Sequence, residues 1–150
     1  MRPLSERAEI GGSLVVVRES GRPYGGRMTT PQRPAALVAA ASVLPVTDVD
    51  RSIEHYRALG FEVAKLTDDY AMAQRGDVAL HLSLMPELDP LKGAGCVYLY
   101  VDDADGLAEE WAEAGVGHTV APVDTDYGLR EGAHVDPDNN LLRFGADVAG

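Results

Sequence analysis

Side chains that could perform chemistry are few and widely spaced in this 150-residue chain. Histidine is the usual residue for proton transfer and metal binding, and a thiol is a common nucleophile. The candidates of these types are His55, His81, His118, His134 and Cys96. None of them belongs to a nucleophile–His–Asp order or a Gly-x-Ser-x-Gly elbow, and the sequence holds no Walker phosphate loop and no dinucleotide fingerprint. Known catalytic motifs therefore do not explain this chain.

Tyrosines beside aspartates indicate binding rather than catalysis. Tyr70 follows Asp68 and Asp69 directly, and Tyr127 follows Asp126. Aromatic rings stack on flat groups, and carboxylates attract cations. The aspartates should attract a cationic small molecule, although exposed aspartates also serve only to keep a surface soluble.

Two further tyrosines, Tyr98 and Tyr100, belong to an apolar run that reads as a strand over residues 96–101. Side chains alternate between the faces of a strand. Both rings should therefore lie on one face, opposite Leu99 and its neighbours. We expect that face to be a ligand surface or a wet interface.

An internal repeat supplies the elements that position these residues. Residues 46–61 match residues 101–116 at a shift of 55, with five identities. Each copy predicts a strand followed by an amphipathic helix, because apolar residues recur at helical spacing. Asp48 and Asp103 precede the helices as N-caps, and Gly60 and Gly115 follow them as C-terminal turns. We expect His55 to be solvated on the outer helix face, and His118 and His134 to lie near strand ends without a partner.

Three strands should follow each helix. They are predicted at residues 61–66, 70–74 and 78–84 in the first copy, and at 118–121, 127–135 and 140–144 in the second. Alternation places Ala79, His81 and Ser83 on one face of the strand at 78–84. Two βαβββ modules, at about 41–85 and 95–145, predict an α+β domain of eight strands with two helices on the outside.

Residues 1–33 differ in charge from residues 34–150. They hold six Arg and three Glu, net +3, whereas the rest holds seven Lys or Arg and 21 Asp or Glu, net −14, which sum to −11. We predict a flexible extension over 1–33 and one domain over 34–150. A signal peptide cleaved near residues 39–41 is the alternative for the segment from residue 33.

Composition excludes several partners and locations. The acidic domain should repel nucleic acid and attract cationic small molecules. No run of about 20 apolar residues predicts a membrane span. The single Cys96 rules out an internal disulfide and favours a cytoplasmic location.

Three stretches together resemble a known family. They read TDVDRSIEHYRALGFEV, YAMAQRGDVALHLS and YGLREGAHVDPDNNLLRFG, and in this order they resemble the bleomycin resistance proteins of the vicinal oxygen chelate (glyoxalase/bleomycin resistance/dioxygenase) superfamily. The resemblance covers about residues 41–145. One departure is Asn139, where the family has glycine in its DPDGN turn, and asparagine tolerates the positive φ expected there.

The resemblance implies a concave eight-stranded mixed sheet and a homodimer with two ligand grooves at the subunit interface. The family's groove aromatics correspond to Tyr70, Tyr98 and Tyr127, and a ligand-contacting serine corresponds to Ser83. Together with the aspartates and neighbouring side chains, the predicted ligand-binding residues are Tyr70, His81, Ser83, Tyr98, Tyr100, Tyr127, Asp68 and Asp69.

The superfamily's enzymes hold a divalent metal, and their ligand positions correspond here to Ala41, a position near His81, Cys96 and Arg143. Alanine has no donor atom, and arginine is a fixed cation. We therefore expect neither a metal nor a cofactor. The resemblance implies a protein that sequesters bleomycin-like or other cationic glycopeptide antibiotics. Two alternatives remain: a metal-dependent enzyme of the glyoxalase or dioxygenase type that uses His81 and Cys96, and a small-molecule sensor or accessory subunit.

Overall fold

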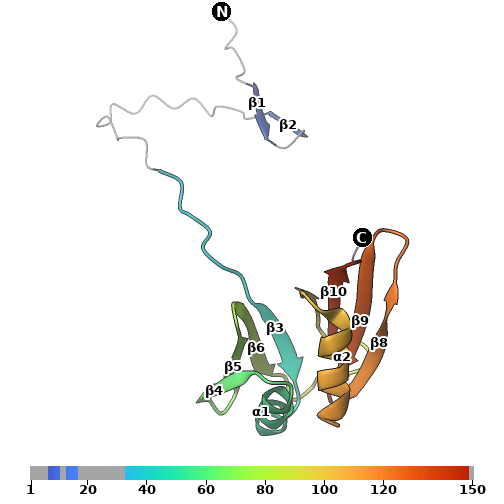
Figure 1. Cartoon of the computed structure of the whole chain (residues 1–150). Helices are drawn as coiled ribbons and strands as arrows, with labels where there is room; N and C mark the ends of the chain where they lie inside the picture. The colour runs from blue at the N-terminus through green and yellow to red at the C-terminus, as the bar shows by residue number, and fades with distance from the viewer. Residues whose placement is uncertain (1–6, 11–12, 17–32, 149–150) are drawn as a thin grey trace, which may run out of the picture. The chain divides into compact units, whose positions relative to one another are not determined.

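The structure, a computed structural model, describes residues 7–10, 13–16 and 33–148 (Figure 1). The chain divides into two compact units, residues 1–37 and residues 38–150. In the first unit, strands β1 (Arg7–Ile10) and β2 (Ser13–Val16) pair in antiparallel fashion. Most of the extension predicted over 1–33 lies outside the described residues, so its predicted flexibility stays a prediction.

The second unit contains the predicted α+β fold, with eight strands and two helices in the order β-α-β-β-β twice. In the first module these elements are β3 (Ser42–Val46), α1 (Val49–Ala58), β4 (Glu62–Thr67), β5 (Tyr70–Arg75) and β6 (Val78–Leu84). In the second they are β7 (Cys96–Tyr100), α2 (Ala104–Glu113), β8 (His118–Asp124), β9 (Leu129–Val135) and β10 (Leu141–Asp147). The eight strands form two four-stranded mixed sheets, one per module, ordered β3-β6-β5-β4 and β7-β10-β9-β8.

Strand register confirms that the second module repeats the first. Val43 pairs with His81 across the parallel strands β3 and β6, and Tyr98 pairs with Arg143 across β7 and β10. Val43 and Tyr98 are 55 residues apart, which is the shift found in the sequence. Both modules also have a register shift at the same point, near Lys65 on β4 and near Val120 on β8.

Local rules explain the ends of both helices. The carboxylate of Asp48 accepts from the Arg51 backbone N–H at 2.9 Å, and that of Asp103 accepts from the Gly106 N–H at 2.9 Å. Gly60 and Gly115 have φ of 84° and 68°, a conformation that glycine adopts without a Cβ clash. The expected caps and C-terminal turns are confirmed.

One apolar core unites the two modules. It includes Tyr56 of α1, Trp111 of α2 and Phe144 of β10, all fully buried. The Trp111 indole N–H donates to the carbonyl of Leu59 in the other module at 3.1 Å. The helices therefore turn their apolar faces into a core shared by both modules, and their polar faces remain exposed, as the amphipathic pattern predicts.

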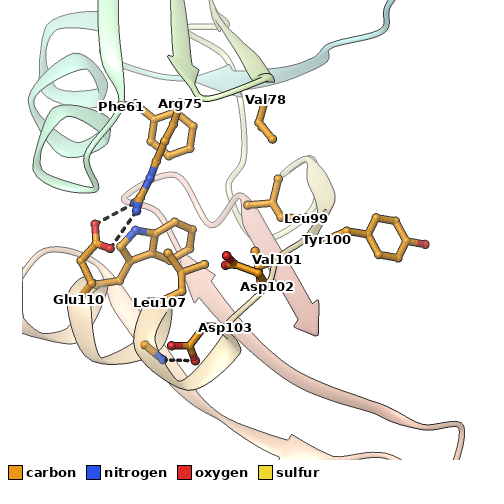
Figure 2. A pocket seen from close by; sticks show the side chains of 12 residues that line it. Phe61, Arg75, Val78, Leu99, Tyr100, Val101, Asp102, Asp103, Leu107 and Glu110 are labelled. Atoms are coloured by element: carbon orange, nitrogen blue, oxygen red, sulfur yellow. Dashed lines mark hydrogen bonds and ion pairs between the residues drawn. The ribbon is translucent and has the colours of Figure 1, made fainter. Parts of the chain in front are cut away.

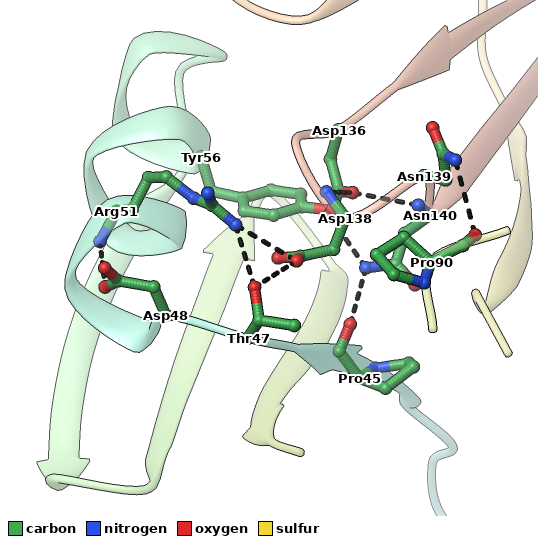
Figure 3. Close-up of polar contacts among 10 residues, drawn as sticks. All are labelled: Pro45, Thr47, Asp48, Arg51, Tyr56, Pro90, Asp136, Asp138, Asn139 and Asn140. Atoms are coloured by element: carbon green, nitrogen blue, oxygen red, sulfur yellow. Dashed lines mark hydrogen bonds and ion pairs between the residues drawn. The ribbon is translucent and has the colours of Figure 1, made fainter. Parts of the chain in front are cut away.

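Polar contacts tie the turn before β10 to the start of the first module (Figure 3). Asp138 accepts from the Thr47 hydroxyl at 2.6 Å and from the Arg51 guanidinium at 3.0 Å. Asp136 accepts from the buried Tyr56 hydroxyl at 2.9 Å. Such buried groups are stable only when hydrogen-bonded, so this turn also fixes how the modules meet. Its residue Asn139 has φ 63°, as predicted.

The expectations for two histidines are wrong. His55 is 5% exposed, and its Nε2 lies 2.9 Å from Nε2 of the fully buried His134 on β9. His55 is on the side of α1 that faces the second module, so packing between modules covers it. No helix in the described part of the chain is long and apolar enough to cross a membrane.

Candidate functional site

The outer face of the second sheet, the face that points away from the shared core, carries the aromatic residues predicted on β7. Leu99 is buried in the core, whereas Tyr100 is 81% exposed. Alternation along the strand places Tyr98 and Tyr100 together on the outer face, with ring centroids 5.0 Å apart. The expectation that these two tyrosines share a face is confirmed.

Glu131 on β9 organises this face, and the sequence did not single it out. Its Oε1 accepts from the Tyr98 hydroxyl at 2.8 Å, and its Oε2 accepts from Tyr127 at 2.6 Å and from Arg143 at 3.0 Å. The Arg143 guanidinium also lies 5.6 Å from the Tyr98 ring centroid, a cation–π distance. We call these four residues the Glu131 cluster. Alternation from Tyr127 along the predicted strand would have placed Glu131 on the same face.

The hydrogen bonds within the Glu131 cluster shift the pKa values of Tyr98 and Glu131. Desolvation, and then the hydrogen bond to Glu131, raise the pKa of Tyr98 to about 12. The hydrogen bonds from Tyr127 and Tyr98 lower the pKa of the Glu131 carboxyl below its ordinary value. At neutral pH the cluster therefore contains one carboxylate, one guanidinium and two neutral phenols.

The outer face of the first sheet carries the second group of predicted residues. The Tyr70 hydroxyl lies 2.8 Å from His81 Nδ1, with the rings in an edge-to-face arrangement. Ser83 pairs in register with Tyr70 and lies two residues from His81 on β6. These three side chains form a polar, hydrogen-bonding patch.

The predicted acidic residues before Tyr70 are exposed. Asp68 lies 3.3 Å from the Lys65 ammonium, which also lies 2.9 Å from Asp50. Part of the negative charge at this edge is thus offset by a lysine.

The predicted site residues therefore form two groups on two sheets. Tyr98 and Tyr100 lie on β7 of the second sheet, and Tyr127 lies in the turn before β9. Tyr70, His81 and Ser83 belong to the first sheet. Each group lies on the face away from the shared core. Within the described residues, no hydrogen bond or ring contact joins one group to the other.

The four positions that correspond to metal ligands offer a poor donor set. Arg143 is bound to Glu131, and His81 is hydrogen-bonded to Tyr70. Cys96 is an exposed free thiol, and Ala41 has no donor. Across residues 7–10, 13–16 and 33–148, no group of three or more His, Cys, Asp or Glu side chains is arranged to hold a metal ion. These residues do not fit the metal of the superfamily's enzymes.

A pocket of about 610 Å³ lies between the modules, on the core side of β7 (Figure 2). Its floor consists of core side chains, among them Phe61 and Trp111. Arg75 and Glu110 close one wall with two hydrogen bonds of 2.8 Å each. Of the predicted ligand residues, Tyr100 alone appears among its lining residues. Tyr100 is thus shared between the outer face of the second sheet and this pocket.

Comparison with known proteins identifies the family of this chain. Residues 37–144 match the model of the Glyoxalase/Bleomycin resistance protein/Dioxygenase superfamily. The chain belongs to this superfamily, as its two βαβββ modules and sheet register indicate.

Three individual proteins of this superfamily are similar to the chain. A bleomycin resistance protein from Klebsiella pneumoniae is 32% identical over 108 residues, which cover 67% of this chain and 86% of that protein. The crystal structure of a bleomycin-binding protein complexed with bleomycin superimposes with a TM-score of 0.69 at 28% identity, and covers 75% of this chain and all of that one. The bleomycin-binding protein from bleomycin-producing Streptomyces verticillus, complexed with copper(II)-bleomycin, gives 0.64 at 28% identity, with 77% and 100% covered. The first of these relatives is a bleomycin resistance protein, and the other two are bleomycin-binding proteins.

Proposed function

We propose that this protein is a cytoplasmic homodimer that binds bleomycin-like or other cationic glycopeptide antibiotics without a metal or cofactor of its own and thereby confers resistance. The observation that carries the proposal is the aromatic outer face around Glu131, in a chain whose relatives bind bleomycin. Sequestration needs no bond-breaking step. Buried aromatic area and charge attraction supply the affinity.

Charge supports a cationic ligand and argues against nucleic acid. The chain has a net charge of −11. This is the sum of −14 on residues 34–150 and +3 on residues 1–33. A negative field raises the local concentration of cations and repels phosphates. Exposed aspartates close to the aromatic faces include Asp69 and Asp126.

The placement of the two groups supports a dimer. Both outer faces carry exposed apolar side chains, such as Val43 at 53% and Val120 at 47%. Apolar surface of this kind favours an interface, and a two-fold axis can set the first face of one copy against the second face of its partner. Tyr70 and His81 of one copy would then meet Tyr98 of the other, and each dimer would contain two equivalent grooves.

The runner-up is a metal-dependent enzyme of the same superfamily. It would need His81 and Cys96 to recruit further ligands, whereas catalytic zinc takes three protein ligands. Ala41 has no side-chain donor and Arg143 is a cation paired with Glu131, so the donor set favours binding over metal catalysis. A sensor or accessory subunit would use the same grooves and would differ in what the bound state does.

Calorimetric titration of bleomycin into chain purified without chelator tests the proposal, together with elemental analysis and sedimentation equilibrium. We expect saturable binding of one bleomycin per chain, a dimer, and no stoichiometric transition metal. A monomer, or the absence of saturable binding, would contradict it. One tightly bound transition metal per chain would favour the enzyme instead.

A further inference from the structure

The carboxylate of Glu131 is largely buried, which is unusual for a charged group. Its side chain is 11% exposed, although it lies on the outer face of a sheet. An ionised carboxylate is expensive to desolvate unless donors surround it. Three donors do so here, and they come from β7, from the turn before β9 and from β10. The carboxylate is therefore used by the protein itself and is not free to bind a cationic ligand.

The contact between Tyr98 and Glu131 requires an empty place on the strand between them. Gly145 on β10 pairs in register with Glu131 on one side and with Tyr100 on the other. A Cβ atom at Gly145 would overlap the Tyr98 hydroxyl. Because glycine leaves this place open, the Tyr98 side chain can reach across β10 to the carboxylate on β9.

Arg143 carries the charge that this face shows to solvent. Its side chain is 46% exposed, four times the exposed fraction of Glu131. A guanidinium has five N–H donors, and the contact with Glu131 at 3.0 Å uses one nitrogen, Nη2. The remaining donors lie beside the Tyr98 ring and can bind an acceptor on a molecule that stacks there.

We propose that Glu131 is a positioning residue that fixes Tyr98, Tyr127 and Arg143 as one preformed platform, and that this platform takes a planar ring bearing a carbonyl acceptor. The ring stacks on tyrosine, and its carbonyl accepts from Arg143. A cationic tail on the same ligand is repelled by Arg143 and lies toward exposed carboxylates such as Asp126. The ligand class rests on the proposed function, whereas the positioning role does not depend on it.

The positioning role can be measured without ligand, by following the tyrosine ring signals in NMR as pH rises. Glu131→Gln and Gly145→Ala should each bring the pKa of Tyr98 down from about 12 toward the ordinary value near 10. Glu113→Gln, on the exposed side of α2, is the matched control and should leave it unchanged. If the Tyr98 titration is the same in all four proteins, Glu131 does not position it.

Bleomycin calorimetry on these proteins, together with Glu131→Ala, tests the link to binding. Glu131→Ala and Gly145→Ala should raise the Kd about tenfold, because side chains that were preformed must then be ordered on binding. Glu131→Gln keeps an acceptor of the same shape and should recover part of the affinity. Variants that shift the Tyr98 pKa and bind bleomycin as the wild type does would overturn the link.

Two matched probes decide the ligand class: 2-naphthamide, which carries a carbonyl, and 2-naphthylmethylamine, which carries a cation. We expect the amide to perturb the Tyr98 ring signals at lower concentration than the amine, and Arg143→Gln to remove this preference. A preference for the amine would overturn the proposed class. If the wild-type protein does not bind bleomycin but binds the amide more tightly than the amine, the proposed function is wrong and the proposed platform is supported.

Discussion

His55 and His134 form a hydrogen bond between their Nε2 atoms, 2.9 Å apart, in the core where the two modules meet. Such a bond needs one protonated and one bare nitrogen. The Thr119 hydroxyl lies 2.8 Å from His134 Nδ1 and completes the set of contacts. Two positive imidazoliums in this place would point two N–H donors at each other, with no acceptor between them.

Acid should therefore weaken the fold. Burial lowers the pKa of His134 to about 4, with a further contribution from nearby His55 and His118, and burial also lowers the pKa of His55, against the attraction of Asp136. Because these folded-state pKa values lie below the unfolded value near 6.5, the unfolded chain binds more protons as pH falls. Stability should be complete above about pH 6.5 and decline toward pH 4, by about 1.4 kcal/mol per pH unit for each extra proton.

Urea denaturation between pH 4 and 7 measures this effect. His134→Gln, which keeps hydrogen-bonding capacity without a titrating ring, should flatten the decline. His118→Gln removes an exposed histidine that makes a smaller contribution to the lowered His134 pKa, so it should change the acid slope much less. An equal acid slope in the wild type and in His134→Gln would show that the buried pair is not its source.

The contact between Thr47 and Asp138 should contribute to stability in proportion to the burial of Asp138, which is 0% exposed. Within the described residues, its Oδ2 already lacks a partner. Thr47→Val keeps the shape but removes a donor from a buried carboxylate, which should cost about 1–3 kcal/mol in the free energy of unfolding. Thr47→Ser keeps the hydroxyl and should cost much less. If both variants lose the same free energy of unfolding, the effect comes from packing and not from the hydrogen bond.

The turn before β10 should tolerate only certain residues at position 139. Asn139 has φ 63°, which a side chain with a Cβ adopts at a cost and asparagine adopts more readily than most. Asn139→Ala should lower the free energy of unfolding by about 1 kcal/mol, and Asn139→Gly should leave it nearly unchanged. Thermal unfolding compares them directly. A harmless alanine would mean that the turn relaxes to another conformation.

Bleomycin affinity should fall as salt rises, because charge attraction contributes to it. Asp69→Asn and Asp126→Asn remove exposed carboxylates near the two aromatic faces, and each should weaken binding by about 0.2–1 kcal/mol while reducing the salt dependence. Glu113→Gln removes the same charge from an exposed helix position distant in sequence from both groups. Affinity that does not change with salt would leave stacking as the main source of binding.

The sequence predicted what depends on neighbours along the chain. The N-caps at Asp48 and Asp103, the positive φ of Asn139 and the strand over 78–84 all follow from local geometry, and all are confirmed. His55 was predicted wrongly because its environment comes from β9, 79 residues away. Glu131 was missed because its partners on β7 and β10 become neighbours only through strand register.

The contact between Thr47 and Asp138 spans 91 residues, and it has a consequence for how the chain is made. The first module leaves the ribosome long before the turn that carries Asp136 and Asp138. Until that turn arrives, the Tyr56 hydroxyl lacks the acceptor that it has in the folded protein. The two halves, though alike in plan, thus complete each other's buried polar contacts, and the first half gains these contacts only after nearly the whole chain has been made.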